Sequence, residues 1–268
     1  MPKLLSCPHC GYRRSWIIRR HHRKCKQCRR EWSAGDYYPI PGVRLAKREW
    51  LRLLDTFIRD KTITAIAREC RLAYATAQRC AQLIRTVMTA DVPEFFLGIC
   101  EADETYVGGS WKNKAIHIRR QGSKRGRGTS KQAIFGILQR NPQRVRIWLV
   151  PNSKGRTTAP KICDQVCPGS SIYTDGHKGY RRLPRYHYLH QWVDHEAGEY
   201  VRGQVHTQGI DGYWGLLKTH LDSIGGIRKE RLYLFIGEHQ WRYNFRHLSR
   251  KEQVQILYDI LKRIGGRK

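Results

Sequence analysis

Acidic residues are scarce in this sequence: 22 Asp and Glu stand against 51 Lys and Arg, which gives a formal net charge of +29. Self-repulsion at such a charge opposes compaction, so solubility alone does not account for the imbalance. The excess is expected of a chain that works against a polyanion, because each neutralised phosphate releases counterions. We therefore expect a nucleic-acid partner, and a basic protein bound to a ribosome or a membrane is the alternative.

Long apolar runs are also missing. The sequence has no stretch of about 20 apolar residues, so no transmembrane helix and no membrane partner are predicted. The N-terminal residues lack the apolar stretch of a signal peptide, so we expect a cytoplasmic, nucleoid-associated protein. Apolar residues still make up 40% of the 268 residues, which allows a sizeable core and excludes a disordered basic tail.

The nine cysteines are expected to be metal ligands or buried thiols, because disulfides are rare in a reducing compartment. Four of them form two Cys-x-x-Cys pairs, Cys7 with Cys10 and Cys25 with Cys28. Two such pairs complete the four-sulfur shell of a structural zinc site. The spacing predicts a zinc ribbon over residues 1–38 that folds on Zn²⁺. A thioredoxin-like redox pair is the alternative, but it leaves the second pair unexplained.

A helix-turn-helix pattern follows a short linker. Apolar residues recur at helical spacing over 45–58, and two more helices are predicted at 62–70 and 75–88. The second helix of such a motif enters the major groove of DNA. The pattern predicts a DNA-binding module over residues 43–92, with Arg79 toward the DNA. An ordinary helical hairpin is the alternative.

From residue 98 the pattern changes to strands. Apolar runs predict four strands, with a crossover helix before the last, at 99–107, 132–139, 145–150 and 171–176. Three strands, a helix and a fourth strand is the order of the ribonuclease-H-like fold. We therefore predict an α/β domain over residues 97–250, with a mixed sheet flanked by helices, and a basic C-terminal helix at 251–268.

Three aspartates of this domain are candidate ligands for Mg²⁺ or Mn²⁺. Asp103 lies on the first predicted strand, Asp175 ends the fourth, and Asp211 lies near the start of a later helix. Carboxylates suit such hard ions, and two ions can activate the attacking oxygen and stabilise the leaving oxygen in phosphodiester cleavage. Lys218 follows Asp211 by seven residues, so it lies near the same helical face and can hold a phosphate.

Other roles are open for these acids. Asp175 also fits a turn, and Asp211 also fits a solvated helix face. Glu101 shares a strand face with Asp103, whereas Glu104 points to the opposite face, and either glutamate is an alternative ligand.

A basic segment containing several glycines lies between the first two predicted strands. We interpret it as a hairpin that contacts DNA and becomes ordered on binding, and a disordered insert is the alternative. Its expected phosphate contacts are Lys112, Lys114, Arg119, Arg120, Lys124, Arg125, Arg127 and Lys131.

Together these motifs resemble the insertion-sequence DDE transposases related to Merlin elements, over nearly the whole chain. The most specific stretches are residues 101–109, 173–176, 205–218 and 240–246. The resemblance implies a metal-dependent transposase that cleaves element ends and joins them to target DNA, with Asp103 and Asp175 as the first two metal ligands. Asp211 stands where the family usually has Glu, and Lys218 matches the basic residue seven positions on.

The resemblance also implies partners and alternatives. Transposition requires paired ends of double-stranded DNA, so a homodimer or a larger assembly is implied. A transposase-derived regulator that binds DNA without cleaving it is the alternative function, favoured by the Asp at position 211. A tyrosine recombinase, suggested by His247 and Arg250, leaves the cysteine pairs and the carboxylates unexplained.

Overall fold

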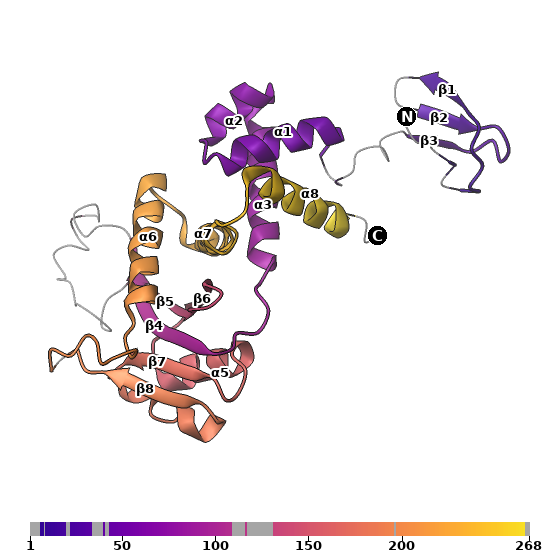
Figure 1. Ribbon diagram of the computed structural model, residues 1–268. Helices are drawn as coiled ribbons and strands as arrows, with labels where there is room; N and C mark the ends of the chain where they lie inside the picture. Colours follow the sequence, from indigo (N-terminus) through magenta and orange to yellow (C-terminus); the bar gives the residue numbers. More distant parts are fainter. Residues whose placement is uncertain are drawn as a thin grey trace. The chain divides into compact units, whose positions relative to one another are not determined.

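The computed structural model describes residues 6–7, 9–19, 22–33, 40, 43–108, 116, 131–195 and 197–265. The chain divides into two units, Met1–Val87 with Leu248–Lys268, and Met88–His247 (Figure 1). None of the helices in the described part is both long and apolar enough to cross a bilayer.

The N-terminal segment forms a small antiparallel sheet in the order β1-β2-β3. Its strands are β1 (Ser15–Arg19), β2 (His22–Cys25) and β3 (Glu31–Ser33). Cys7, Cys25 and Trp32 form its buried cluster, with Cys28 packed against them. This cluster buries too little apolar surface to stabilise the N-terminal sheet by itself. A metal ion bound to the cysteines would supply the missing folding free energy.

The rest of the first unit is helical. It contains α1 (Lys47–Ile58), α2 (Ile63–Cys70), most of α3 (Tyr74–Ala90), and α8 (Arg250–Gly265). The first three helices lie where the apolar periodicity predicts them. The C-terminal helix α8 packs along α1, and Arg250 forms an ion pair of 2.8 Å with Asp55.

A tight turn joins α2 to α3. Thr62 caps the start of α2, where its hydroxyl accepts a hydrogen bond from the Ala65 N–H at 3.2 Å. Arg71 ends the helix in the left-handed conformation, and Leu72 N–H bonds back to the Ala67 carbonyl. A short turn therefore separates the two helices, and Arg79 is exposed on α3.

The second unit contains a five-stranded mixed sheet in the order β6-β5-β4-β7-β8. Its strands are β4 (Ile99–Val107), β5 (Gln132–Gln139), β6 (Arg144–Val150), β7 (Ser171–Asp175) and β8 (Leu189–Val193). Neighbours among β4, β5 and β6 are antiparallel, whereas β7 runs parallel to both β4 and β8. The four predicted strands are confirmed to within one residue, and β8 is an addition.

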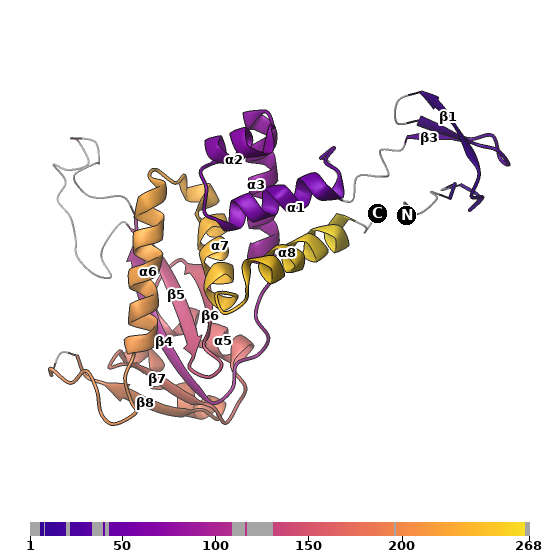
Figure 2. The ribbon, with the colours of Figure 1, turned by 45° about the horizontal axis from the view of Figure 1, so that its top comes forward.

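Helices cover both faces of this sheet (Figure 2). The crossover helix α5 (Gly155–Gln165) places Ile162 against one face, in a cluster with Phe135 and Ile172. Helices α6 (Gln208–Ile224) and α7 (Leu232–Asn244) cover the other face, where Trp214 and Ile236 lie. Short 3-10 helices are η4 (Lys178–Tyr180), η5 (Leu183–Tyr186) and η6 (Lys229–Arg231).

Two amides of α7 cover the outer edge of strand β6. The side chain of Asn244 accepts from the Val145 N–H at 2.8 Å and donates to the Val145 carbonyl at 2.9 Å. The Ile147 N–H donates to Gln240 Oε1 at 2.9 Å. Because Gln240 and Asn244 are four residues apart, one helical face satisfies alternate backbone groups of the edge strand, which blocks pairing with another chain.

Candidate active site

Two candidate acids lie on neighbouring parallel strands. Strands β4 and β7 pair in a register that sets Glu101 opposite Tyr173. Two residues further along both strands lie Asp103 and Asp175, which therefore project from the same face of the sheet. Both side chains are half-buried.

The third candidate acid faces them from the first turn of α6. Asp211 is exposed, and its Oδ2 accepts a hydrogen bond of 3.0 Å from the Thr207 hydroxyl. One turn further on, Trp214 is buried and its Nε1–H donates to Asp103 Oδ2 at 2.9 Å. Helix α6 thus carries Asp211 and also contacts Asp103 directly.

The pKa of the Asp103 carboxyl is raised well above its ordinary value. Burial is the largest cause, and the negative charge of Glu104 adds to it. The charges of Asp211 and Asp175 raise it further, so both aspartates lie close enough to act on Asp103. Gathered carboxylates of this kind repel one another, and a divalent cation with oxygen ligands relieves that repulsion.

The two glutamates that are alternative ligands on β4 both have protein partners. Glu101 is buried, and its carboxylate accepts hydrogen bonds from Arg140 Nε at 2.6 Å and the Ile210 N–H at 2.8 Å. Glu104 accepts a hydrogen bond of 2.6 Å from the hydroxyl of Tyr180. Both carboxylate oxygens of Glu101 are therefore engaged by protein groups.

Sequence reasoning missed the roles of Arg140 and Trp214. Arg140 directly follows β5 and offers no local signal. A signal for Trp214 was present, because Gly136 interrupts an apolar strand, and such a glycine often marks close approach of another group. A Cβ atom at Gly136 would lie 2.5 Å from Trp214 Cη2, so the indole packs directly against the bare strand.

The four N-terminal cysteines form a compact cluster. Cys7 Sγ lies 3.6 Å from Cys28 Sγ, and Cys10 Sγ lies 3.5 Å from Cys25 Sγ. Four sulfurs held about 2.3 Å from one tetrahedral zinc ion lie roughly 3.8 Å apart, so the spacing fits zinc. Backbone N–H groups of Gln27 and Cys28 donate to Cys25 Sγ.

These backbone donors also favour the thiolate that binds metal. Burial raises the pKa of Cys25, but the Cys28 and Gln27 N–H groups outweigh it and lower the pKa to about 7. In the part of the chain that the structure describes, the four cysteines are the only group of three or more His, Cys, Asp or Glu whose ligand atoms all lie within 4.8 Å of one another. The three aspartates are spaced more widely.

The predicted basic contacts are only partly described. Lys218 on α6 and Arg79 on α3 are exposed, as is Lys131 before β5. The remaining predicted contacts lie outside the described residues: Lys112, Lys114, Arg119, Arg120, Lys124, Arg125 and Arg127.

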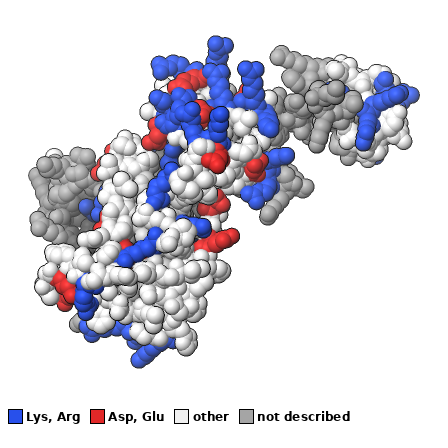
Figure 3. Space-filling model, in the orientation of Figure 1, with Lys and Arg blue, Asp and Glu red and all other residues white. Residues whose placement is uncertain are grey.

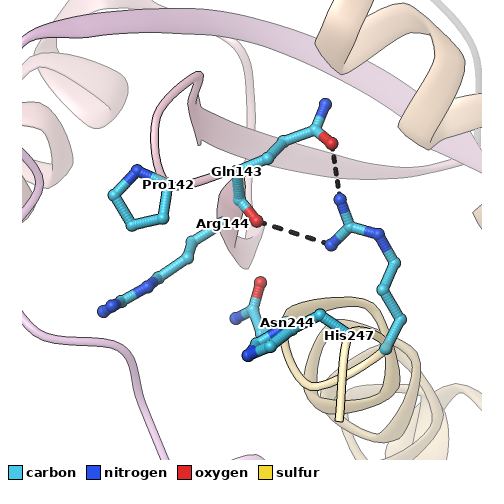
Figure 4. A pocket seen from close by; sticks show the side chains of 6 residues that line it. Pro142, Gln143, Arg144, Asn244 and His247 are labelled. Atoms are coloured by element: carbon cyan, nitrogen blue, oxygen red, sulfur yellow. Dashed lines mark hydrogen bonds between the residues drawn. The ribbon is translucent and has the colours of Figure 1, made fainter.

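A pocket of about 340 Å³ lies elsewhere on this unit, where the turn between β5 and β6 meets the end of α7. Arg246 donates to both the carbonyl and the side-chain oxygen of Gln143, and Figure 4 marks these two hydrogen bonds at Gln143 with dashed lines. The other lining residues are Pro142, Arg144, Asn244 and His247. None of the three aspartates lines this pocket, so it is separate from the candidate active site.

The chain is similar to several known proteins. Residues 95–244, more than half of the chain, match the family model of the ISXO2-like transposase domain. An uncharacterized transposase-like protein of Haemophilus influenzae is 32% identical over 114 residues, which cover 42% of this chain and 90% of that protein. An uncharacterized protein in transposable element ISH50 of Halobacterium salinarum is 28% identical over 246 residues, which cover 88% of this chain and 82% of that protein.

Solved structures give a weaker likeness. A chain in the cryoEM structure of the simian T-cell lymphotropic virus intasome in complex with PP2A regulatory subunit B56 gamma matches with a TM-score of 0.36 and 11% identity. The match covers 74% of this chain and 69% of that chain.

Proposed function

Because the chain belongs to the family of the ISXO2-like transposase domain, we propose that it is a transposase that cleaves the DNA ends of its element and joins them to target DNA. The reaction proposed is metal-dependent phosphodiester hydrolysis followed by strand transfer. The observation that carries the proposal is the placement of Asp103 and Asp175 on neighbouring parallel strands, with Asp211 in the first turn of α6, close enough for both charges to act on Asp103. Gathered carboxylates of this kind suit divalent cations.

In this proposal Asp103, Asp175 and Asp211 hold Mg²⁺ or Mn²⁺. When bound, two such ions supply activation of the attacking oxygen and stabilisation of the leaving oxygen. Trp214 orients Asp103 through its indole N–H. The exposed ammonium of Lys218 lies seven residues after Asp211 on the same helix, where it binds a phosphate of the DNA.

We assign the second unit to the ribonuclease-H-like class. The strand order β6-β5-β4-β7-β8, with three antiparallel strands and two parallel additions, supports this assignment. So does the placement of Asp103 on the first strand and Asp175 at the end of the fourth. The catalytic domain is proposed to cover residues 97–250, before the C-terminal helix at 251–268.

We assign DNA recognition to the first unit, through the zinc ribbon at 1–38 and the helix-turn-helix module at 43–92. Figure 3 shows Lys and Arg side chains gathered over the helices of this unit. Such a surface neutralises DNA phosphates whatever the base sequence. Arg79 on α3 is the residue expected to approach the major groove. The exposed basic residues between Arg44 and Arg79 are Arg44, Lys47, Arg48, Arg52, Arg59, Lys61, Arg68, Arg71 and Arg79, and helix α8 adds Arg250, Lys251, Lys262 and Arg263.

Partners follow from the proposed reaction. The protein binds the double-stranded ends of its element and then the target DNA. Synapsis of two ends calls for a homodimer or a larger assembly on DNA, which analytical ultracentrifugation of the complex with end DNA tests directly.

Cleavage of DNA that carries the element ends tests the proposal. Asp103→Ala and Asp175→Ala are expected to abolish Mg²⁺-dependent cleavage, while gel-shift binding of the same DNA survives. Asp164→Ala is the matched control, because Asp164 is exposed on α5. Full cleavage by both Asp103→Ala and Asp175→Ala would contradict the proposal.

A DNA-binding regulator without cleavage activity is the second candidate. Two observations favour it: position 211 carries Asp, which is shorter than Glu by one methylene, and the three aspartates lie further apart than the cysteine ligands. Wild-type protein that binds the end DNA but never nicks it with Mg²⁺ or Mn²⁺ would establish this function and exclude the transposase.

A further inference from the structure

A buried ion pair joins the strand that carries Asp103 to the helix that carries Asp211. Glu101 is only 1% exposed, and its Oε1 accepts from Arg140 Nε at 2.6 Å. Its Oε2 accepts from the backbone N–H of Ile210 at 2.8 Å. Ile210 immediately precedes Asp211, so this hydrogen bond fixes the helix start one residue from the third candidate acid.

Arg140 holds the segment that leads into α6. Its Nη1 donates to the carbonyl of Gln204 at 2.8 Å, and its Nη2 donates to the carbonyl of His206 at 3.0 Å. The same Nη2 lies 2.9 Å from Nδ1 of the His206 ring. The guanidinium also stacks over the ring of Tyr173, two residues before Asp175, with 5.0 Å to the ring centre. One charged pair therefore touches all three elements that carry the acids.

The first turn of α6 is shaped to receive this carboxylate. A Cβ atom at Gly209 would lie 2.9 Å from Glu101 Oε2 and 3.1 Å from Oε1. The Glu101 carboxylate cannot move away without losing its hydrogen bonds to Arg140 and to the Ile210 N–H. A glycine at position 209 is thus what lets the glutamate reach the helix backbone.

Stability alone is a poor reason for this arrangement. Removing two charges from water costs free energy, and apolar replacements of similar volume are often as stable as a buried ion pair or more so. What the pair supplies is geometry, because hydrogen bonds to four backbone or ring groups define one position for the start of α6.

We propose that Glu101 and Arg140 are positioning residues that set Asp211 at its working distance from Asp103 and Asp175. The inference rests on the proposed function, in which these aspartates share divalent metal. Neither residue binds the metal: Glu101 acts through Ile210, and Arg140 acts through Glu101 and the segment before α6. Outer residues of this kind typically change metal affinity by about 10- to 100-fold.

Binding of Mn²⁺ alone to the full-length, zinc-loaded protein tests the proposal. Free Mn²⁺ is measured by electron paramagnetic resonance, with Asp103→Ala defining the background. Gly209→Ala and Glu101→Gln are expected to weaken Mn²⁺ binding at least tenfold at a temperature where circular dichroism shows them folded. Gly212→Ala is the matched control in the same helix, because a Cβ atom there meets open space, and it is expected to bind Mn²⁺ as the wild type does.

A double-mutant cycle separates positioning from simple packing. If Glu101 and Arg140 act as one unit, Glu101→Gln with Arg140→Met weakens Mn²⁺ binding no more than Arg140→Met alone. A purely structural role would lower the melting temperature of the variants and leave the Mn²⁺ affinity of the folded protein unchanged. That outcome, or strictly additive effects in the cycle, overturns the proposal.

The transposase function and the positioning role of Glu101 and Arg140 fail in different ways. Wild-type cleavage together with unchanged Mn²⁺ affinity in Gly209→Ala and Glu101→Gln rejects the positioning role and leaves the transposase in place. Weakened Mn²⁺ binding in these variants, with no cleavage by the wild type, rejects the transposase and leaves the positioning role in place.

Discussion

The indole Nε1–H of Trp214 donates a hydrogen bond of 2.9 Å to Oδ2 of Asp103, although the two residues are 111 positions apart in the sequence. The contact depends on Gly136, which pairs with Asp103 across the sheet and leaves room for the indole. A buried tryptophan thus uses its one polar atom to orient a candidate metal ligand.

Replacing Trp214 by Phe removes this donor and keeps most of the ring. We expect the Mg²⁺ concentration for half-maximal cleavage to rise about tenfold, because outer hydrogen bonds orient metal-binding carboxylates. Trp148→Phe is the control, since Trp148 stacks on Phe135 away from the aspartates. A metal requirement that stays the same in Trp214→Phe would show that the hydrogen bond does not orient the ligand.

Replacing Asn244 by Ala removes the two side-chain hydrogen bonds to the backbone of the edge strand β6. The Val145 N–H and C=O groups then lose their partners in a buried place, and each costs about 1–3 kcal/mol. Urea unfolding should show a stability loss of roughly 2–6 kcal/mol, the sum for the two groups, and light scattering should show more aggregation through the uncovered edge of β6. Gln191→Ala, an exposed amide on β8, is expected to be close to neutral. Equal stabilities for the two variants would rule out edge protection by Asn244.

Metal analysis should find one zinc ion per chain at the cysteine cluster. Cys10→Ser and Cys28→Ser are expected to lose it, because each removes one of the four sulfurs that surround a common point. Cys70→Ser, on α2, is expected to retain zinc in full. Zinc retained after either ribbon substitution would argue against a four-cysteine site.

Acid should destabilise the packing of α7 on α6 through His239. Burial and the neighbouring charge of His220 lower the pKa of His239 from 6.5 to about 4. Below pH 6.5 the unfolded chain binds a proton that the folded chain does not, so stability falls as the pH drops from 6.5 to 4. The full loss is on the order of 3 kcal/mol.

Urea midpoints between pH 7.5 and 4.5 measure this effect. In His239→Gln the urea midpoint should fall less steeply as the pH drops below 6.5, because glutamine does not titrate. The glutamine side chain can still form a hydrogen bond with the nearby Tyr213 hydroxyl. The exposed residue His247 serves as control, and the urea midpoint of His247→Gln should depend on pH as that of the wild type does. If the urea midpoint of His239→Gln falls with pH as steeply as that of the wild type, the loss of stability in acid is due to other groups.

The sequence by itself determined the local elements and the candidate ligands. An apolar period of 3.6 residues predicted the helices, because burial on one helical face imposes that period, and short apolar runs predicted four strands of the sheet. Spacing predicted the cysteine cluster, because two residues between cysteines suffice to turn both sulfurs to one point. The aspartates stood out because acids are scarce in so basic a chain.

The tertiary structure decided which side chains meet. Arg140 pairs with Glu101 across 39 residues, and Asn244 bonds to Val145 across 99. Such contacts depend on strand register and on how helices cross a sheet, and neither leaves a periodic mark in the sequence. Strand β8 was missed because most of its side chains are exposed. The packing of α8 beside α1 depends on contacts between segments that are far apart in the sequence. The contacts of Glu101 with Arg140 and the Ile210 N–H, on which the positioning proposal rests, likewise arise only in the folded chain.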